Sequence, residues 1–139
     1  MQEAHRAIEW IDNEFAPGAR AATPGTGTES SSGTSHFETV IRVLGGLLSA
    51  HHLADRSPVL LSAATEMGLR LLAGWQTPHG VPSKCVNLST PVTAPCEDHR
   101  DPCLADAGTN ALEFHALGQV WHAPFQCTAP HSSVQFRPA

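Results

Sequence analysis

Apolar side chains recur at helical spacing in four segments of the chain. In the clearest of them, residues 37–51, they occupy positions i, i+3, i+4, i+7, i+10, i+11 and i+14, which form one continuous helix face. The same pattern predicts helices over residues 3–15, 57–72 and 101–117. The last two each open on a capping residue followed by proline, which is typical of a helix start.

The segments between these helices are rich in residues that interrupt regular structure. Pro17 ends the first helix, and residues 19–35 are almost entirely Ala, Gly, Ser, Thr and Pro, so we expect a flexible loop there. Residues 77–80 predict a turn, and residues 83–100 show no sustained period. No polar–apolar alternation is long enough to predict a strand. The pattern therefore predicts an all-α fold of antiparallel helix pairs with long loops.

This reading divides the chain into four parts. Residues 1–18 form an N-terminal helix and residues 19–35 the Gly/Ser/Thr-rich loop. Residues 36–120 form the main helical body. In the tail, residues 121–139, repeated prolines argue against a further helix.

Composition excludes several classes of function. The chain has 8 Lys and Arg against 13 Asp and Glu, a formal charge of -5, so no basic patch is available to neutralise phosphates. We therefore expect no nucleic-acid partner. The longest uncharged apolar run, residues 43–50, is far shorter than the roughly 20 residues that cross a bilayer. We expect no transmembrane segment, and no secretory signal is visible.

The cysteines and histidines do not predict a metal site. None of the four cysteines (Cys85, Cys96, Cys103, Cys127) forms a C-x-x-C pair. They are expected to be buried thiols, or to form one or two disulfides in an oxidising compartment. Adjacent histidines, as at positions 51 and 52, point about 100° apart on a helix and do not easily share one metal.

The opposite face of the 37–51 helix carries a candidate site. Glu38, Arg42, Gly45 and Ser49 share that face, so a carboxylate and a guanidinium project together beside small residues. A glycine pair inside a helix costs roughly 1 kcal/mol per residue, so another helix or a ligand is expected to approach the backbone there. Spacing alone favours a structural role, in which residues 35–38 are a capping box and Glu38 pairs with Arg42.

The last predicted helix carries a second acidic face. Asp106 and Glu113 are seven positions apart, with Thr109 and Asn110 between them. Two carboxylates on one side of a helix could bind sugar hydroxyls or position a water, or they could be an ordinary solvated surface. Spacing alone favours the solvated surface.

Several motifs follow one another along the chain. In order, they are Phe37-Glu38-Thr39-Val40-Ile41-Arg42-Val43-Leu44-Gly45-Gly46-Leu47-Leu48-Ser49-Ala50-His51, Gly68-Leu69-Arg70-Leu71-Leu72, Thr77-Pro78-His79-Gly80-Val81-Pro82, Val86-Asn87-Leu88, Leu104-Ala105-Asp106-Ala107-Gly108-Thr109 and Leu112-Glu113-Phe114. Together these motifs resemble the class I α-1,2-mannosidases, glycoside hydrolase family 47. The resemblance covers residues 36–118 and is weaker in residues 3–15.

The resemblance implies a partial (αα)7 barrel over residues 36–120. It implies removal of α-1,2-linked mannose from high-mannose N-glycans with inversion, a Ca²⁺ cofactor, and the lumen of the endoplasmic reticulum or Golgi. Glu38 matches the family's proposed general acid and Arg42 a substrate-contacting arginine. Asp106 stands where the family usually has glutamate, and together with Glu113 it is expected to contact substrate.

The resemblance also implies that part of the site lies elsewhere. The family's other catalytic acids and its calcium-binding threonine belong to later helices, so residues 1–139 alone are expected to be inactive. Two alternatives remain open: a protein that recognises mannose-rich glycans in endoplasmic-reticulum-associated degradation, and a non-functional helical fragment.

Overall fold

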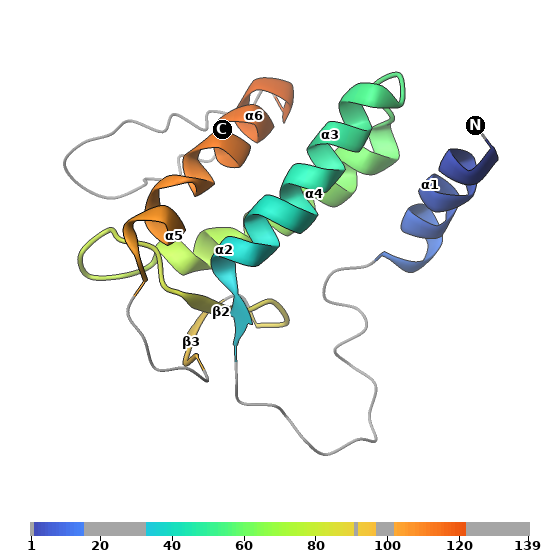
Figure 1. Cartoon of the computed structure of the whole chain (residues 1–139). Coiled ribbons are helices and arrows are strands. Elements are labelled where there is room, and N and C mark those ends of the chain that lie inside the picture. Colours follow the sequence, from blue (N-terminus) through green and yellow to red (C-terminus); the bar gives the residue numbers. More distant parts are fainter. Residues whose placement is uncertain (1, 16–32, 91, 97–101, 122–139) are drawn as a thin grey trace, which may run out of the picture.

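The structure is a computed structural model that describes residues 2–15, 33–90, 92–96 and 102–121 (Figure 1). It is mainly helical, with one small sheet at the base of the helices. The elements in chain order are α1 (Gln2–Glu14), β1 (Thr34–Ser35), α2 (His36–Thr39), the π-helical segment η2 (Val40–Leu44), α3 (Gly45–Leu53), α4 (Pro58–Leu71), the 3₁₀ segment η3 (Leu72–Trp75), β2 (Cys85–Asn87), β3 (Val92–Ala94), α5 (Leu104–Gly108) and α6 (Asn110–Trp121).

The predicted helix over residues 37–51 is confirmed as the uninterrupted run α2–η2–α3. Its first turn is capped by Ser35, whose side chain accepts a hydrogen bond from the Glu38 backbone N–H at 3.3 Å. The π-helical stretch in its middle was not predicted. Such stretches are rare, and they occur frequently at functional sites.

The helices pack as antiparallel neighbours around one core. After α3 the chain reverses through Asp55 and Arg56, both with left-handed backbone (φ 46° and 59°), and α4 runs back beside α3 (Figure 1). α6 packs on both α4 and η2. The fully buried side chains that these helices share include Val40, Leu44, Leu60, Ala64, Leu71 and Leu117. The predicted all-α architecture is therefore confirmed, and the predicted helix at residues 3–15 is present as α1.

The expectation that no strand would form is wrong for three short segments. β1 pairs antiparallel with β2, and β2 with β3, in the order β1-β2-β3. Strands of two or three residues are too short to show a polar–apolar alternation. The sheet lies where α2 begins, because the backbone N–H of His36 donates to the Lys84 carbonyl at 2.8 Å. It therefore fixes the start of the helix that carries Glu38.

Other local predictions hold with changed boundaries. The turn at residues 77–80 is confirmed and ends at Gly80, whose φ of 69° favours glycine. The helix predicted over residues 101–117 is two helices, α5 and α6, separated by a turn at Thr109. Residues 16–32 and 122–139 lie outside the described residues. In the described segments, no helix combines the length and the apolar character needed to cross a bilayer.

One disulfide, which was among the alternatives for the cysteines, joins Cys85 in β2 to Cys96 beyond β3. Their Cα atoms are 5.5 Å apart and the two residues are 11 positions apart in sequence. Cys103 is a free, exposed thiol. Disulfides persist mainly in oxidising compartments.

We expect Cys96→Ser to lower the free energy of unfolding by about 3 kcal/mol, because the loop that the disulfide closes gains freedom in the unfolded chain. Urea unfolding measures the change. Cys103→Ser is the matched control and should stay within about 0.5 kcal/mol of the unmodified chain, since that thiol is exposed. Equal effects of the two substitutions would contradict a stabilising role for the disulfide.

Candidate functional site

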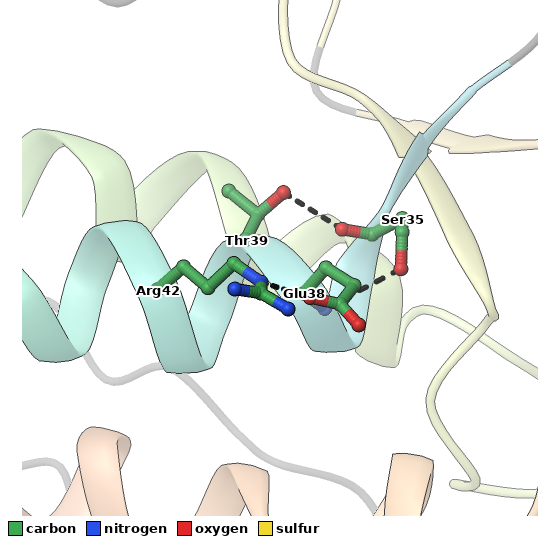
Figure 2. A network of polar contacts seen from close by, with 4 residues as sticks. All are labelled: Ser35, Glu38, Thr39 and Arg42. Atoms are coloured by element: carbon green, nitrogen blue, oxygen red, sulfur yellow. Dashed lines mark hydrogen bonds and ion pairs between the residues drawn. The ribbon is translucent and has the colours of Figure 1, made fainter.

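Glu38 and Arg42 lie one helical turn apart on the outer side of the α2–η2 run. The Nε of Arg42 donates to the Glu38 carboxylate, and Figure 2 shows the arginine side chain extending back along the helix to reach it. On the same turn, the Thr39 hydroxyl donates to the Ser35 carbonyl at 2.7 Å. The Glu38 backbone is therefore held by the cap, while its carboxylate engages Arg42. The predicted i,i+4 pair is confirmed.

Both side chains of this pair are open to solvent. The Glu38 side chain is 47% exposed and the Arg42 side chain 73%. The hydrogen bond that Arg42 donates to Glu38, together with the negative charge of Glu38, raises the pKa of Arg42 above its ordinary value. The guanidinium is thus a permanent cation beside a carboxylate, and exposed pairs of this kind contribute only about 0–1 kcal/mol to stability. The pair is therefore accessible from solvent and contributes little to stability.

Glu113 of α6 packs against the small-residue end of the same face. A Cβ placed on Gly45 would lie 3.4 Å from the Glu113 Cγ and 3.5 Å from Oε1. The other carboxylate oxygen, Oε2, is buried and has no hydrogen-bond partner among the described residues. A helix side chain therefore makes the expected close approach at Gly45, whereas nothing lies within 4 Å of a Cβ on Gly46. The Glu113 side chain also leaves a buried acceptor that requires a donor.

Asp106 has a different environment from the one that its spacing suggested. Its Oδ2 accepts a hydrogen bond from the Cys103 backbone N–H at 2.9 Å, which caps the start of α5. Because the turn at Thr109 separates α5 from α6, Asp106 and Glu113 do not share one uninterrupted helix. α5 packs against α2, so Asp106 still lies on an element adjacent to Glu38.

An open hollow of about 440 Å³ lies at the far end of the helices from Glu38. It is formed by the last turns of α3 and α6. Ser49, the last residue of the predicted face, contributes to its wall; the other lining residues are Leu48, His51, His52, Leu53, Ala116 and Val120. The glutamate–arginine pair and this hollow are therefore separate features.

The two glycines of α3 offer a direct comparison. We expect Gly45→Leu to lower the free energy of unfolding by about 1–3 kcal/mol, because the new side chain extends into Glu113. Gly46→Leu is the control, since nothing lies within 4 Å of a Cβ at Gly46, and it should raise stability by about 0.5–1 kcal/mol through helix propensity. Thermal unfolding measures both, and an unaltered melting curve for Gly45→Leu would contradict the close approach.

The structure also reveals a buried polar pair that the sequence analysis did not predict. His36 is 1% exposed and Asn110 fully buried, and the His36 Nδ1 lies 3.2 Å from the Asn110 Nδ2. The His36 Nε2 lies 3.0 Å from the Leu71 carbonyl oxygen. Burial lowers the pKa of His36, and the hydrogen bond to Leu71 offsets part of that effect. No local pattern could have indicated this pair.

The lowered pKa of His36 makes stability depend on pH. The unfolded chain binds a proton at about pH 6.5, whereas the folded chain resists protonation to a lower pH. The contribution of His36 is therefore complete above about pH 6.5 and is lost as the pH falls toward the folded-state pKa, with a slope of at most about 1.4 kcal/mol per pH unit. Urea unfolding at several pH values should show that the free energy of unfolding depends less steeply on pH in His36→Gln than in the unmodified chain. Exposed His52, changed to Gln, should keep the slope of the unmodified chain.

The described residues do not form a site for Ca²⁺. This ion takes six to eight oxygen ligands, often from several carboxylates. Within the described ranges, no group of three or more His, Cys, Asp or Glu side chains lies close enough together to hold a metal ion.

Comparison with known proteins identifies the family. The sequence model of glycosyl hydrolase family 47 matches residues 1–124. The chain is 36% identical over 114 residues to a mannosyl-oligosaccharide 1,2-α-mannosidase of Arabidopsis thaliana. The matched region covers 81% of this chain and 20% of that protein. It is 32% identical over 123 residues to the endoplasmic reticulum mannosyl-oligosaccharide 1,2-α-mannosidase of Schizosaccharomyces pombe (88% and 22%).

A third relative carries a different kind of name. The human ER degradation-enhancing α-mannosidase-like protein 2 is 39% identical over 108 residues, covering 65% of this chain and 17% of that protein. The chain thus spans about a fifth of the length of the relatives it matches. The match over residues 1–124 includes every helix described above, and the chain belongs to glycosyl hydrolase family 47.

Proposed function

We propose that this chain supplies the proton-donating part of a glycosidase site that removes α-1,2-linked mannose from N-glycans. The observation that carries the proposal is the Glu38–Arg42 pair on an open helix face. Family membership and the names of the 1,2-α-mannosidase relatives support the substrate class. The proposal assigns Glu38 as general acid, and Arg42, Asp106 and Glu113 as groups that contact the sugar.

In this mechanism Arg42 exchanges Glu38 for a sugar hydroxyl when the glycan arrives. Its guanidinium donates several N–H bonds and sits on a long, exposed stem, so it can serve either partner. Released from Arg42, the Glu38 carboxylate takes up a proton from solvent, and the resulting carboxylic acid donates this proton to the glycosidic oxygen as the bond from that oxygen to the anomeric carbon breaks. A second carboxylate removes a proton from a water, and this water attacks the anomeric carbon from the opposite face of the sugar ring. The attack inverts the configuration at that carbon. We place this second carboxylate outside the described residues.

The unsatisfied carboxylate oxygen of Glu113 supports the proposal that this site binds a carbohydrate. A buried acceptor without a donor costs about 1–3 kcal/mol, and a sugar hydroxyl or a bridging water would remove that cost. Ca²⁺, which the family implies, enters no step here, because the described carboxylates do not fit its coordination. The proposed location is the lumen of the endoplasmic reticulum or Golgi; the disulfide fits an oxidising lumen, and the names of two relatives support the endoplasmic reticulum.

A second candidate is recognition of mannose-rich glycans without cleavage. It is favoured by the 39% identity to an ER degradation-enhancing α-mannosidase-like protein. Both candidates predict binding at Glu38 and Arg42, but only the first predicts release of mannose. A high-mannose glycan incubated with a family-length protein that contains this segment therefore separates them.

Binding is tested directly on the 139-residue chain by nuclear magnetic resonance. Titration with α-1,2-linked mannobiose should give saturable shifts at the Glu38 amide and the Arg42 Nε, and Arg42→Gln should abolish them. Arg6→Gln is the matched control, because Arg6 is also exposed and pairs with a glutamate on its own helix. Absence of saturable shifts in the unmodified chain would overturn the proposal. So would identical titrations of the two variants.

A further inference from the structure

His36 joins three parts of the fold from a buried position two residues before Glu38. Its Nε2 lies 3.0 Å from the Leu71 carbonyl oxygen at the end of α4. Because a carbonyl oxygen only accepts hydrogen bonds, Nε2 carries the proton and Nδ1 is the acceptor. That acceptor receives the amide N–H of Asn110, at the start of α6, over 3.2 Å.

The side-chain amide of Asn110 also connects His36 to α5, the helix that carries Asp106. Its Nδ2 also donates to the Asp106 backbone carbonyl at 2.8 Å. Asp106 in turn caps α5 through its side chain. A short chain of hydrogen bonds therefore connects the backbone just before Glu38 with the backbone at Asp106, although the two acids lie on different helices.

The imidazole ring has little freedom to move. A Cβ on Gly74 would lie 2.5 Å from the His36 Cδ2 and 2.7 Å from its Nε2, so the ring occupies the space that a side chain would fill. The Trp75 ring packs edge-on against it, with ring centroids 6.3 Å apart. The Glu38 and Arg42 side chains are exposed by comparison, so the buried anchor of their backbone is His36.

We propose that His36 and Asn110 are a positioning pair. The pair holds α2, which carries Glu38, at a set distance and angle from α5, which carries Asp106. Two apolar side chains would fill the same space without burying polar atoms, and here the Asn110 Oδ1 is buried without a partner. Hydrogen bonds are directional, whereas apolar contacts are not. The polar pair therefore sets the relative orientation of the two helices in addition to any stability that it contributes. The inference rests on the proposed function, because that geometry matters only if Glu38 and Asp106 act on one ligand.

The test compares Asn110→Leu with the double variant His36→Leu/Asn110→Leu in the 139-residue chain. The single variant leaves the His36 Nδ1 buried and unpaired, so it should unfold at lower urea concentration than the double variant, in which both polar groups are gone. Residual dipolar couplings of backbone amides then measure the orientation of α2 relative to α5. In the folded double variant we expect a changed orientation and about tenfold weaker binding of α-1,2-linked mannobiose.

A double variant that keeps both the couplings and the mannobiose affinity of the unmodified chain would overturn the proposal. If the unmodified chain itself does not bind mannobiose, the proposed function fails, while the couplings still decide whether the pair sets the orientation. Should the double variant not fold, Asn110→Ala is measured in the same way. It removes the donated N–H groups and introduces no new hydrogen-bond partner for His36, so unchanged couplings would again overturn the proposal.

Discussion

Replacing Glu38 by glutamine is expected to lower mannose release about 10²–10⁴-fold, the usual loss when a general acid is removed. The assay uses the Arabidopsis 1,2-α-mannosidase relative with its matching segment replaced by that of this chain, so that catalytic groups outside this segment are present. Glutamine has the shape of glutamate but donates no proton to the glycosidic oxygen. The melting temperature should not change by more than a degree or two, because the pair with Arg42 is exposed.

The matched control is Glu66→Gln. Glu66, whose side chain is 47% exposed like that of Glu38, pairs with Arg70 at the same i,i+4 spacing on α4, 3.0 Å apart. Its loss should leave turnover within about twofold, since surface substitutions away from a site change stability by only about 0.5 kcal/mol. Unchanged turnover in Glu38→Gln would return Glu38 to a helix-pairing role and remove it from the mechanism.

Gly74→Ala should be the most destabilising of the single substitutions considered, lowering the free energy of unfolding by about 3–5 kcal/mol. The added methyl group would meet the His36 ring at 2.5 Å, and that ring is held by Leu71 and Asn110, so it cannot simply rotate away. Either the chain at Gly74 shifts or the buried hydrogen bonds break. Urea unfolding measures the loss.

Gly68 and Gly108 provide graded controls for this prediction. A Cβ on Gly68 would lie 2.4 Å from the Leu117 Cδ2, the far end of a flexible side chain, so Gly68→Ala should cost less than Gly74→Ala. Nothing lies within 4 Å of a Cβ on Gly108, and its substitution by alanine should be neutral or slightly stabilising. The same loss at all three positions would contradict a specific role for the fixed His36 ring.

The helices and the glutamate–arginine pair could be predicted because their signals are local. Apolar positions three and four apart define the buried face of α3 and α4, and the same spacing brings Glu38 to Arg42. The break at Thr109 was missed, since residues on both sides of it keep helical backbone and apolar spacing. The strands were missed because two or three residues carry too little pattern.

The sequence by itself determined the helical architecture, the family, and the residue types available to the site, since each of these depends on near neighbours or on ordered motifs. Only the tertiary structure decided that Glu113 packs on Gly45 and that His36 meets Asn110. The last two residues are 74 positions apart. Contacts over such distances arise from how whole helices pack, so no local spacing specifies them.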